Sequence, residues 1–458
     1  MNALTTPPIN AAIKKKDVKS LDKILTTLSG FEIADLIANK TEEEKLLIFS
    51  VLSPKHAAET FDYLSLKTQK HILHSSTPEL VANMLTEMPP DDRTALFEEL
   101  PRLVADVYIK LLPNGERRLA IALLGYPEDS VGRLMTTDYI AVKPDWSVEQ
   151  VLDYIRAYGH DSETISVIYI IDDKGALIDD VRIREFLFVS KDDKVNQITD
   201  KKFVALSVLD SAEKAINVFK QYDRTALPAI DEEGILKGIV TIDDILRIAS
   251  EINTDKMQKV GGTEALDEPY MEIPFLKLMH KRAHWLVLLF IGEMFTATAM
   301  GFFEAEIEKA VVLALFLPLI ISSGGNAGSQ SSTLIIRAMA LGEVKLSDWW
   351  RIMKKEILSG LFLGSVLGLI GFARVTIWSA VSSIYGVHWL LVALTISLSL
   401  IGVVLWGSLT GSMLPFMLRS VGFDPATASA PLVATLVDVT GIVIYFLMAM
   451  WILKGSLL

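Results

Sequence analysis

Five long apolar segments in the C-terminal part of the chain constrain its fold more than any other feature. Each supplies the ~20 mostly apolar residues that a helix needs to cross a bilayer. They cover residues 284–303, 311–336, 356–379, 388–415 and 431–453. A large soluble helical protein is the alternative, but five such segments in series favour a membrane. We therefore predict an α-helical transmembrane domain with five spans over residues 275–458.

The charge of the chain divides at the same place. The whole chain has 44 Lys and Arg residues against 56 Asp and Glu residues, a net charge of −12. Residues 1–274 hold 47 acidic and 32 basic side chains, whereas residues 275–458 hold 9 acidic and 12 basic. This acidic balance argues against a nucleic-acid partner. The absence of cysteine excludes disulfides, thiolate nucleophiles and cysteine-ligated metal sites.

The positions of lysine and arginine predict how the chain lies in the cell membrane. The N-terminus is polar, so we do not expect a signal peptide. Basic residues gather before span one, between spans two and three, and between spans four and five: Lys281, Arg282, Arg337, Lys345, Arg351, Lys354, Lys355 and Arg419. Cytosolic loops carry this excess. We expect a multi-pass protein with its N-terminus in the cytosol and its C-terminus outside.

Residues 1–131 have the pattern of short amphipathic helices in series. Apolar residues recur three and four positions apart, with breaks at Ser53-Pro54, Thr77-Pro78, Pro89-Pro90 and Pro113-Asn114-Gly115. Ser or Thr before a helix and Pro at its first position are typical helix starts. Short helical units in sequence predict an α-helical superhelix.

Residues 132–250 contain an internal repeat. The segment 171–175 recurs as 230–234, and 181–186 recurs as 240–245, both at an offset of 59 residues. Each repeat has the order helix, β-branched strand, Asp-Gly turn, strand and helix. This pattern resembles a tandem pair of CBS modules, an α+β fold that in other proteins often binds adenosine nucleotides. ATP is therefore a candidate ligand.

The second repeat offers the better nucleotide site. The segment 238–244 is similar to the CBS strand-to-helix signature, in which the Thr241 hydroxyl and the Asp244 carboxylate can hold a ribose. Plain capping of the following helix selects the same residue types, so both interpretations stay open. The first repeat has Asp179-Asp180 in place of the glycine, which disfavours a nucleotide there.

Two motifs in the spans indicate an ion pathway. Span two has Pro318 followed by Gly324-Gly325-Asn326-Ala327-Gly328-Ser329-Gln330, small and polar residues at membrane depth. The glycines permit either close packing or local unwinding of the helix, and packing leaves Asn326 and Gln330 without a role. Asp438 in span five has no Lys or Arg within a turn, so it needs a transported cation, a proton or a distant partner. Oxygen ligands favour hydrated Mg²⁺ over zinc or copper.

Together with the segments Asp424-Pro425-Ala426 and 431–441, these motifs resemble the MgtE family of Mg²⁺ channels. The order of a helical N domain, tandem CBS domains, a connecting (plug) helix over 251–274 and five spans matches that family along essentially the whole chain. The resemblance implies a homodimer whose pore is lined by spans two and five. The implied Mg²⁺ site consists of Asp438, the carbonyl of Ala434 and a turn formed by Gly324, Gly325 and Asn326.

The resemblance also implies regulation by internal Mg²⁺, which neutralises the acidic domains and lets the connecting helix plug the pore. The matching regulatory acids are Asp91, Glu213, Asp223, Asp244, Asp255 and Asp424. An ordinary solvated acidic face is the alternative for any one of them. Arg247, Ile252 and Lys256 stand at positions that are acidic in family members. We therefore expect weaker closure, or a higher threshold for it.

Two residues of the spans fall outside these motifs. Ala430 stands where family members have Asn, which removes an amide that could bond a metal-bound water. Glu293 in span one is a second intramembrane acid. We rank a packed, protonated carboxyl bonded to Thr296 or to a neighbouring helix above a position in a vestibule, because Glu293 has no ion-coordinating neighbours in the sequence.

The sequence thus predicts a Mg²⁺-selective channel or transporter. It has no P-loop, no paired catalytic residues and no nucleophile–base constellation, so an enzyme is not expected. A proton- or Na⁺-coupled divalent cation transporter is the first alternative, because a buried Asp in a broken helix would also permit coupling. A membrane sensor in which the CBS pair reports nucleotide is the second.

Overall fold

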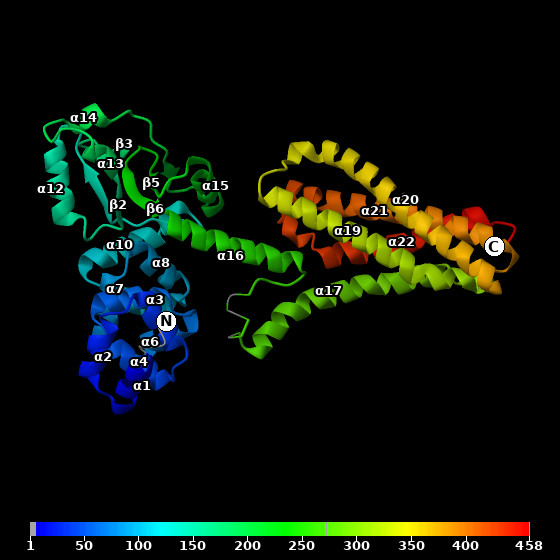
Figure 1. Ribbon diagram of the computed structural model, residues 1–458, viewed down its shortest axis with the longest axis horizontal. Coiled ribbons are helices and arrows are strands. Elements are labelled where there is room, and N and C mark those ends of the chain that lie inside the picture. Colours follow the sequence, from blue (N-terminus) through cyan, green and yellow to red (C-terminus); the bar gives the residue numbers. More distant parts are fainter. Residues whose placement is uncertain (1–5, 267, 269, 272, 458) are drawn as a thin grey trace. The chain divides into compact units, whose positions relative to one another are not determined.

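The computed structural model describes residues 6–266, 268, 270, 271 and 273–457 (Figure 1). The chain divides into two compact units, Met1–Ser250 and Glu251–Leu458. The division lies inside one helix, α16 (Ile242–Val260). The helix expected over 251–274 is therefore the continuation of the last CBS helix, and it ends at Val260.

The N-terminal unit begins with a row of short helices (Figure 1). They are α1 (Thr6–Lys15), α2 (Val18–Leu25), α3 (Gly30–Ala38), α4 (Glu42–Val51), α5 (Pro54–Asp62), α6 (Leu66–Ser75), α7 (Pro78–Glu87), α8 (Pro90–Glu98), α9 (Arg102–Leu111) and α10 (Asn114–Leu124). The predicted breaks are confirmed, since Pro54, Pro78 and Pro90 each begin a helix. Proline suits this position because its missing N–H would have no helical acceptor.

The row of helices winds into the predicted superhelix. Helix α3 packs on α5, α5 on α7 and α7 on α9, while α2 packs on α4 and α4 on α6. Each helix thus buries its apolar face mainly against the helix two positions further along. The core between them contains Ile33, Phe49, Phe61 and Leu85, all fully buried.

The CBS repeat follows as two three-stranded sheets with the same topology. The strands are β1 (Tyr139–Val142), β2 (Thr164–Ile171), β3 (Leu177–Arg182), β4 (Leu206–Ser207), β5 (Ala226–Ile230) and β6 (Leu236–Thr241). The helices are α11 (Val131–Leu134), α12 (Val148–Tyr158), α13 (Ile183–Leu187), α14 (Val195–Ile198), α15 (Ala212–Tyr222) and α16. In each sheet the first strand is parallel to the second, and the second is antiparallel to the third.

The two repeats meet at their hairpin turns. Gly175 and Gly234 occupy equivalent turn positions at φ +85° and +78°, a conformation that favours glycine. The Leu177 N–H donates to the Gly234 carbonyl, and the Leu236 N–H donates to the Gly175 carbonyl, both at 3.0 Å. This reciprocal pair confirms the predicted internal repeat.

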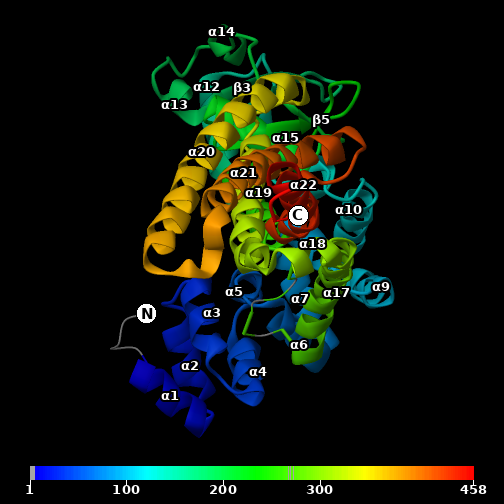
Figure 2. The same cartoon turned by 90° about the vertical axis from the view of Figure 1, so that its right-hand side faces the viewer.

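The C-terminal unit contains five segments long and apolar enough to cross a membrane, as predicted. Their helices are α17 (Phe275–Phe302), α19 (Leu317–Ala340), α20 (Trp349–Val381), α21 (Trp389–Ser420) and α22 (Ala430–Leu453). Short connections are α18 (Glu304–Lys309) and the 3₁₀ helices η1 (Val311–Phe316), η2 (Leu346–Asp348), η3 (Ser383–His388) and η4 (Pro425–Thr427). Helices α19, α21 and α22 pack on one another, and Figure 2 shows them side by side.

Glycine allows these helices to approach closely. A side chain at Gly364 of α20 would meet the Cα of Ile401 at 2.8 Å, and one at Gly328 of α19 would meet the Gly407 carbonyl at 3.1 Å. Helix α19 continues without interruption through Gly324 and Gly325. The turn expected there is therefore wrong: Gly324 packs closely against Val403 and Val437, and Pro318 marks the start of the helix rather than a break.

Candidate functional site

Asp438 lies in a polar cavity between the second and fifth spans. The cavity measures ≈ 340 Å³ and is lined by Pro318, Ile321, Ser322, Gly325, Asn326, Ser329, Ala434 and Asp438. All these residues belong to α19 or α22, and Ala434 precedes Asp438 by about one helical turn. A side chain at Gly325 would put its Cβ 3.0 Å from Asp438 Oδ1, so glycine leaves the space in front of the carboxylate open.

The structure brings four of the five predicted pore residues to this cavity, namely Gly325, Asn326, Ala434 and Asp438. Gly324 does not line it. It is buried on another face of α19, toward Val403 and Val437. Gly324 thus acts in helix packing, a role that the sequence left open.

One face of α19 carries exposed polar side chains. Ser322, Asn326 and Gln330 are spaced four residues apart, so they lie above one another on the helix. The Asn326 Nδ2 donates to Ser322 Oγ at 3.3 Å. A row of amides and hydroxyls is unfavourable toward lipid, and it suits water, an ion or another protein surface.

Hydrogen bonds from α19 fix the chain at the start of α22. Ser329 Oγ donates to the Ala430 carbonyl at 3.0 Å, and Ser332 Oγ donates to the Ala428 carbonyl at 2.7 Å. Ser429 caps α22 by accepting from the Leu432 N–H. The start of α22, and with it the height of Asp438 along α19, is therefore tied by side chains of α19.

Glu293 of α17 lies close enough to Asp438 of α22 for the two carboxyl groups to interact electrostatically. The Thr296 Oγ1 donates to Glu293 Oε2 at 3.3 Å, as expected. The neighbouring helix also places Asp438, the acid predicted to hold the ion, beside Glu293, and the sequence did not predict this contact. Nothing in the sequence could pair residues 293 and 438, because the contact comes from the packing of α17 on α22.

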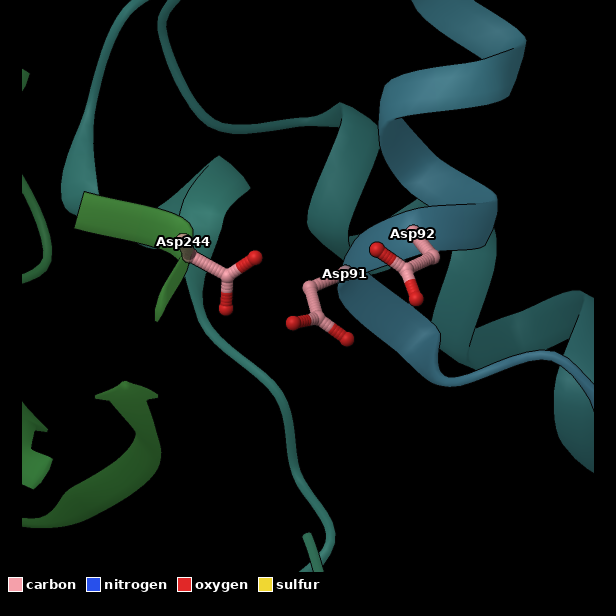
Figure 3. A group of neighbouring side chains, drawn as sticks. All are labelled: Asp91, Asp92 and Asp244. Atoms are coloured by element: carbon pink, nitrogen blue, oxygen red, sulfur yellow. The ribbon is translucent and has the colours of Figure 1, made fainter. Parts of the chain in front are cut away.

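A second group of carboxylates lies in the N-terminal unit (Figure 3). Carboxylate oxygens of Asp91, Asp92 and Asp244 all lie within 4.8 Å of one another, an arrangement that could hold a metal ion. Asp91 and Asp92 come from the first turn of α8, and Asp244 from the first turn of α16. Asp91 and Asp244 were predicted. Asp92 was missed, although it directly follows Asp91 on the same helical turn.

The surroundings of this group disfavour uncompensated negative charge. Burial, followed by the nearby Asp62 and Asp244, raises the pKa of Asp92 to about 7. Burial also holds the pKa of Asp91 well above its ordinary value, and Asp92 adds to this effect. Asp91 is 6% exposed, and its Oδ1 has no hydrogen-bond partner. A buried, unpartnered carboxylate oxygen aimed at two others fits a hard divalent cation.

Arg247 contacts this group. Its Nη2 lies 2.9 Å from Asp244 Oδ1 and 3.7 Å from Asp92 Oδ1. Thr241 Oγ1 donates to the other oxygen, Asp244 Oδ2, at 2.7 Å. Both oxygens of Asp244 are thus engaged, and a ribose at Thr241 and Asp244 would have to compete with these contacts.

A fully buried arginine fixes the helix that carries Asp91 and Asp92. Arg93 Nη1 donates to the Leu85 carbonyl of α7 at 3.0 Å, and its Nη2 lies 2.5 Å from Glu116 Oε2 of α10. Helix α8 is thereby bound to both neighbours. The sequence signal for this anchor is weak, because Arg93 resembles a solvated residue of an acidic helix.

The other predicted regulatory acids lie elsewhere. Among the described residues, the metal-compatible group does not include Glu213 at the start of α15, Asp223 at its end or Asp255 on α16. Asp424 precedes η4, where its Oδ1 accepts from the Ala426 N–H at 2.9 Å. Its Oδ2 lies 3.1 Å from the Lys259 Nζ of α16.

Comparisons with known proteins agree along the whole chain. Residues 317–448 match the family model described as MgtE, divalent cation transporter, and residues 28–129 match the MgtE intracellular N domain. Residues 131–192 and 195–251 match the CBS domain.

Two named relatives and two solved structures give the same result. The chain is 34% identical to the magnesium transporter MgtE of Thermus thermophilus, over 98% of both chains. It is 28% identical to MgtE of Enterococcus faecalis, over 95% of this chain and 94% of that one. The cytosolic domain of the Mg²⁺ channel MgtE in complex with ATP covers 53% of this chain and 98% of its own, at TM-score 0.51 and 30% identity. The soluble part of a magnesium transporter covers 54% and 98%, at TM-score 0.52 and 24% identity, and shows the fold alone.

Proposed function

The chain belongs to the MgtE family of magnesium transporters, which are membrane proteins rather than enzymes, and we propose that it conducts Mg²⁺ past Asp438. The observation that carries this proposal is the cavity that Asp438, Ala434 and Asn326 share between α19 and α22. Its lining offers carboxylate, amide and hydroxyl oxygens but no sulfur or imidazole. Such a set suits a hard cation that keeps part of its water.

The working pore is a homodimer in this proposal. The exposed row of Ser322, Asn326 and Gln330 supports a second copy, because a polar face within a bilayer span needs protein or water against it. Two facing Asp438 carboxylates would repel each other and would attract a divalent cation between them. The Ala434 carbonyl completes the wall.

We place residues 1–274 in the cytosol and the C-terminus outside, since basic residues gather in the connections predicted to face the cytosol. The proposed division is a helical N domain over 1–131, CBS domains over 132–250, a connecting segment over 251–274 and a pore domain over 275–458. In this arrangement the acidic N-terminal unit is exposed to internal Mg²⁺.

Regulatory Mg²⁺ binds in this proposal at Asp91, Asp92 and Asp244. The fit rests on three carboxylates within 4.8 Å and on the unpartnered Asp91 Oδ1. A bound divalent cation would neutralise charges that burial and mutual repulsion otherwise disfavour. Arg247 already supplies one positive charge, so we propose that closure by internal Mg²⁺ needs a higher concentration than in a site without it.

The remaining predicted acids, Glu213, Asp223, Asp255 and Asp424, belong to the same regulatory proposal at separate places. Asp424 forms an ion pair with Lys259, so a second basic residue of α16 contacts a predicted regulatory carboxylate. ATP is proposed as a ligand of the CBS pair, since the related cytosolic domain was solved in complex with ATP. Equilibrium dialysis of the full-length protein with ATP tests this, and a Thr241→Val variant with unchanged ATP retention would exclude Thr241 from the site.

The proposed function is tested by Mg²⁺ flux into liposomes that hold the purified full-length protein. Wild-type protein should carry Mg²⁺ down its gradient, and Asp438→Ala should abolish the flux. Glu304→Gln, an acidic residue of α18 outside the spans, is the matched control and should transport normally. Undiminished Mg²⁺ flux through Asp438→Ala would refute the assignment of Asp438.

The same liposomes separate a channel from a coupled transporter. A channel responds to voltage and to the Mg²⁺ gradient, so collapsing a proton or Na⁺ gradient should leave Mg²⁺ uptake unchanged. Uptake that requires an imposed proton or Na⁺ gradient would instead support a coupled divalent cation transporter.

A further inference from the structure

Glu293 is a second intramembrane carboxylate beside the proposed pathway, and the proposed function gives it no role. Glu293 is the only acidic residue of α17. A charged carboxylate near the centre of a span costs about 3 kcal/mol on insertion scales, so such a residue is kept for a reason of packing or of function. Packing is a weak explanation here, because Glu293 is exposed on the single chain.

Close packing of α17 on α22 brings Glu293 to Asp438. A side chain at Gly292 would meet the Cγ2 of Thr435 at 2.7 Å, so glycine at 292 lets α17 approach α22 at this level. The Glu293 carboxyl group then lies beside Ala434 and Thr435, close enough to Asp438 to interact with it electrostatically. Thr296 Oγ1 donates to Glu293 Oε2 and orients it from one helical turn away.

Ala434 lines two cavities. Glu293 lines a cavity of ≈ 510 Å³ together with Pro431, Ala434 and Thr435, whereas Asp438 lines the ≈ 340 Å³ cavity, which also contains Ala434. The two acids therefore flank the residue whose carbonyl is proposed to contact the ion. The cavity beside Glu293 also has apolar walls from Leu286, Leu289 and Phe290, so the room for a cation with its water lies in the more polar cavity in front of Asp438.

The pair has no internal counter-charge. Among the residues that the structure describes, neither Glu293 nor Asp438 forms an ion pair with a lysine or arginine. Two neighbouring carboxylates at low dielectric must share a proton or hold a cation. One divalent cation balances two carboxylates, whereas one monovalent cation leaves a net negative charge.

We propose that Glu293 is a second cation-facing carboxylate of the conduction pathway and that it sets the preference for divalent over monovalent cations. This inference rests on the proposed function of Asp438. Each chain then offers two negative charges at one level of the membrane, the arrangement by which rings of Asp and Glu select cations.

The test compares Glu293→Gln with wild-type protein in liposomes. The variant keeps the size of the side chain and its hydrogen bond to Thr296 but removes the charge. We expect the half-saturating Mg²⁺ concentration to rise about tenfold, because a charge-assisted contact is lost. The ratio of K⁺ flux to Mg²⁺ flux should rise as well, while the maximal Mg²⁺ flux changes less. A half-saturating concentration and a flux ratio within about twofold of wild type would overturn the proposal.

Further variants keep the test decisive. Glu293→Asp retains the charge on a shorter side chain, so the half-saturating concentration should rise only about threefold. If Glu293→Gln does not reconstitute, an unchanged value for Glu293→Asp overturns the proposal. Glu304→Gln is the control for loss of an acid outside the spans. Uptake that a proton gradient drives in wild type but not in Glu293→Gln would assign Glu293 to proton transfer and would also overturn it.

The variant Asp438→Asn distinguishes failure of the proposed pathway from failure of the proposed role of Glu293. If Asp438→Asn abolishes flux while Glu293→Gln behaves as wild type, only the role of Glu293 fails. If Asp438→Asn transports normally, the pathway itself is wrong, and the role of Glu293 fails with it.

Discussion

The two units of the chain each bring carboxylates from different helices together, and the two groups differ in how their charge is balanced. In the N-terminal unit, Asp92 and Asp244 share the group with the tethered guanidinium of Arg247. In the C-terminal unit, Asp438 and Glu293 have each other but no lysine or arginine in an ion pair among the described residues. A group with its own cation has part of its charge balanced without metal, although burial still raises the pKa of Asp91 and of Asp92. A group without one depends on a mobile ion.

The comparison predicts first that blocking the space at Asp438 lowers Mg²⁺ flux and does not change Mg²⁺ binding by the N-terminal group. Gly325→Val should reduce Mg²⁺ flux roughly 100-fold, because a side chain there would meet Asp438 Oδ1 and fill the space in front of the carboxylate. Gly301→Ala of α17, where a side chain would meet nothing within 4 Å, is the matched control for liposome flux. Normal flux through Gly325→Val would contradict the proposed pathway.

Removing Asp91 should weaken Mg²⁺ binding by the N-terminal unit and leave Mg²⁺ flux through the pore in place. Asp91→Asn should raise the Mg²⁺ concentration that half-stabilises the full-length protein in detergent by roughly 10- to 100-fold, because a charged ligand is lost. Flux at low internal Mg²⁺ should persist. Thermal unfolding followed over a Mg²⁺ series measures the first effect, with the exposed Asp192→Asn as control. An unchanged Mg²⁺ midpoint would remove Asp91 from the regulatory site.

The raised pKa values of Asp91 and Asp92 predict that Mg²⁺ binding by the N-terminal group depends on pH. Because the pKa of Asp92 is about 7, protons compete with Mg²⁺ below that pH, so the Mg²⁺ midpoint should be up to about tenfold higher at pH 6 than at pH 8.

Without divalent cations, the protein should become less stable as the pH rises. A carboxylate in an ordinary ion pair has the opposite effect, because its contribution to stability is lost as the pH falls. The folded-state pKa of Asp92 is above the ordinary value of 3.8, so its contribution to stability is lost as the pH rises from there to about 7. Asp92→Asn should flatten this dependence in thermal unfolding experiments. A dependence as steep in Asp92→Asn as in wild type would assign it to another group.

The smallest expected effect concerns Arg247. Arg247→Met should lower the Mg²⁺ midpoint about two- to fivefold, the range for a partly exposed ion pair. Arg156→Met, which removes an exposed ion pair with Asp153, is the matched control. A higher midpoint in Arg247→Met would mean that Arg247 supports the metal site rather than competing with it.

Sequence patterns predicted the elements of this fold better than the contacts between them. Apolar length alone gave five spans, and the prolines gave the helix starts, because both act within one segment. The contact of Glu293 with Asp438 and the meeting of Asp91 with Asp244 join residues more than a hundred positions apart, and only packing decides them. The prediction of an unwound turn at Gly324 was wrong for a related reason. Glycine permits either unwinding or close approach of a helix, and the neighbouring helix decides which occurs.

The row of helices α1 to α10 has a consequence for the order of folding. Each helix finds its main partners within a few dozen residues along the chain, so the contact order of this region is low and its folding should be fast. Synthesis proceeds from the N-terminus, and domains generally fold as units while later ones are made. The superhelix can therefore be complete on the ribosome before α17, the first apolar helix of the C-terminal unit, has been translated.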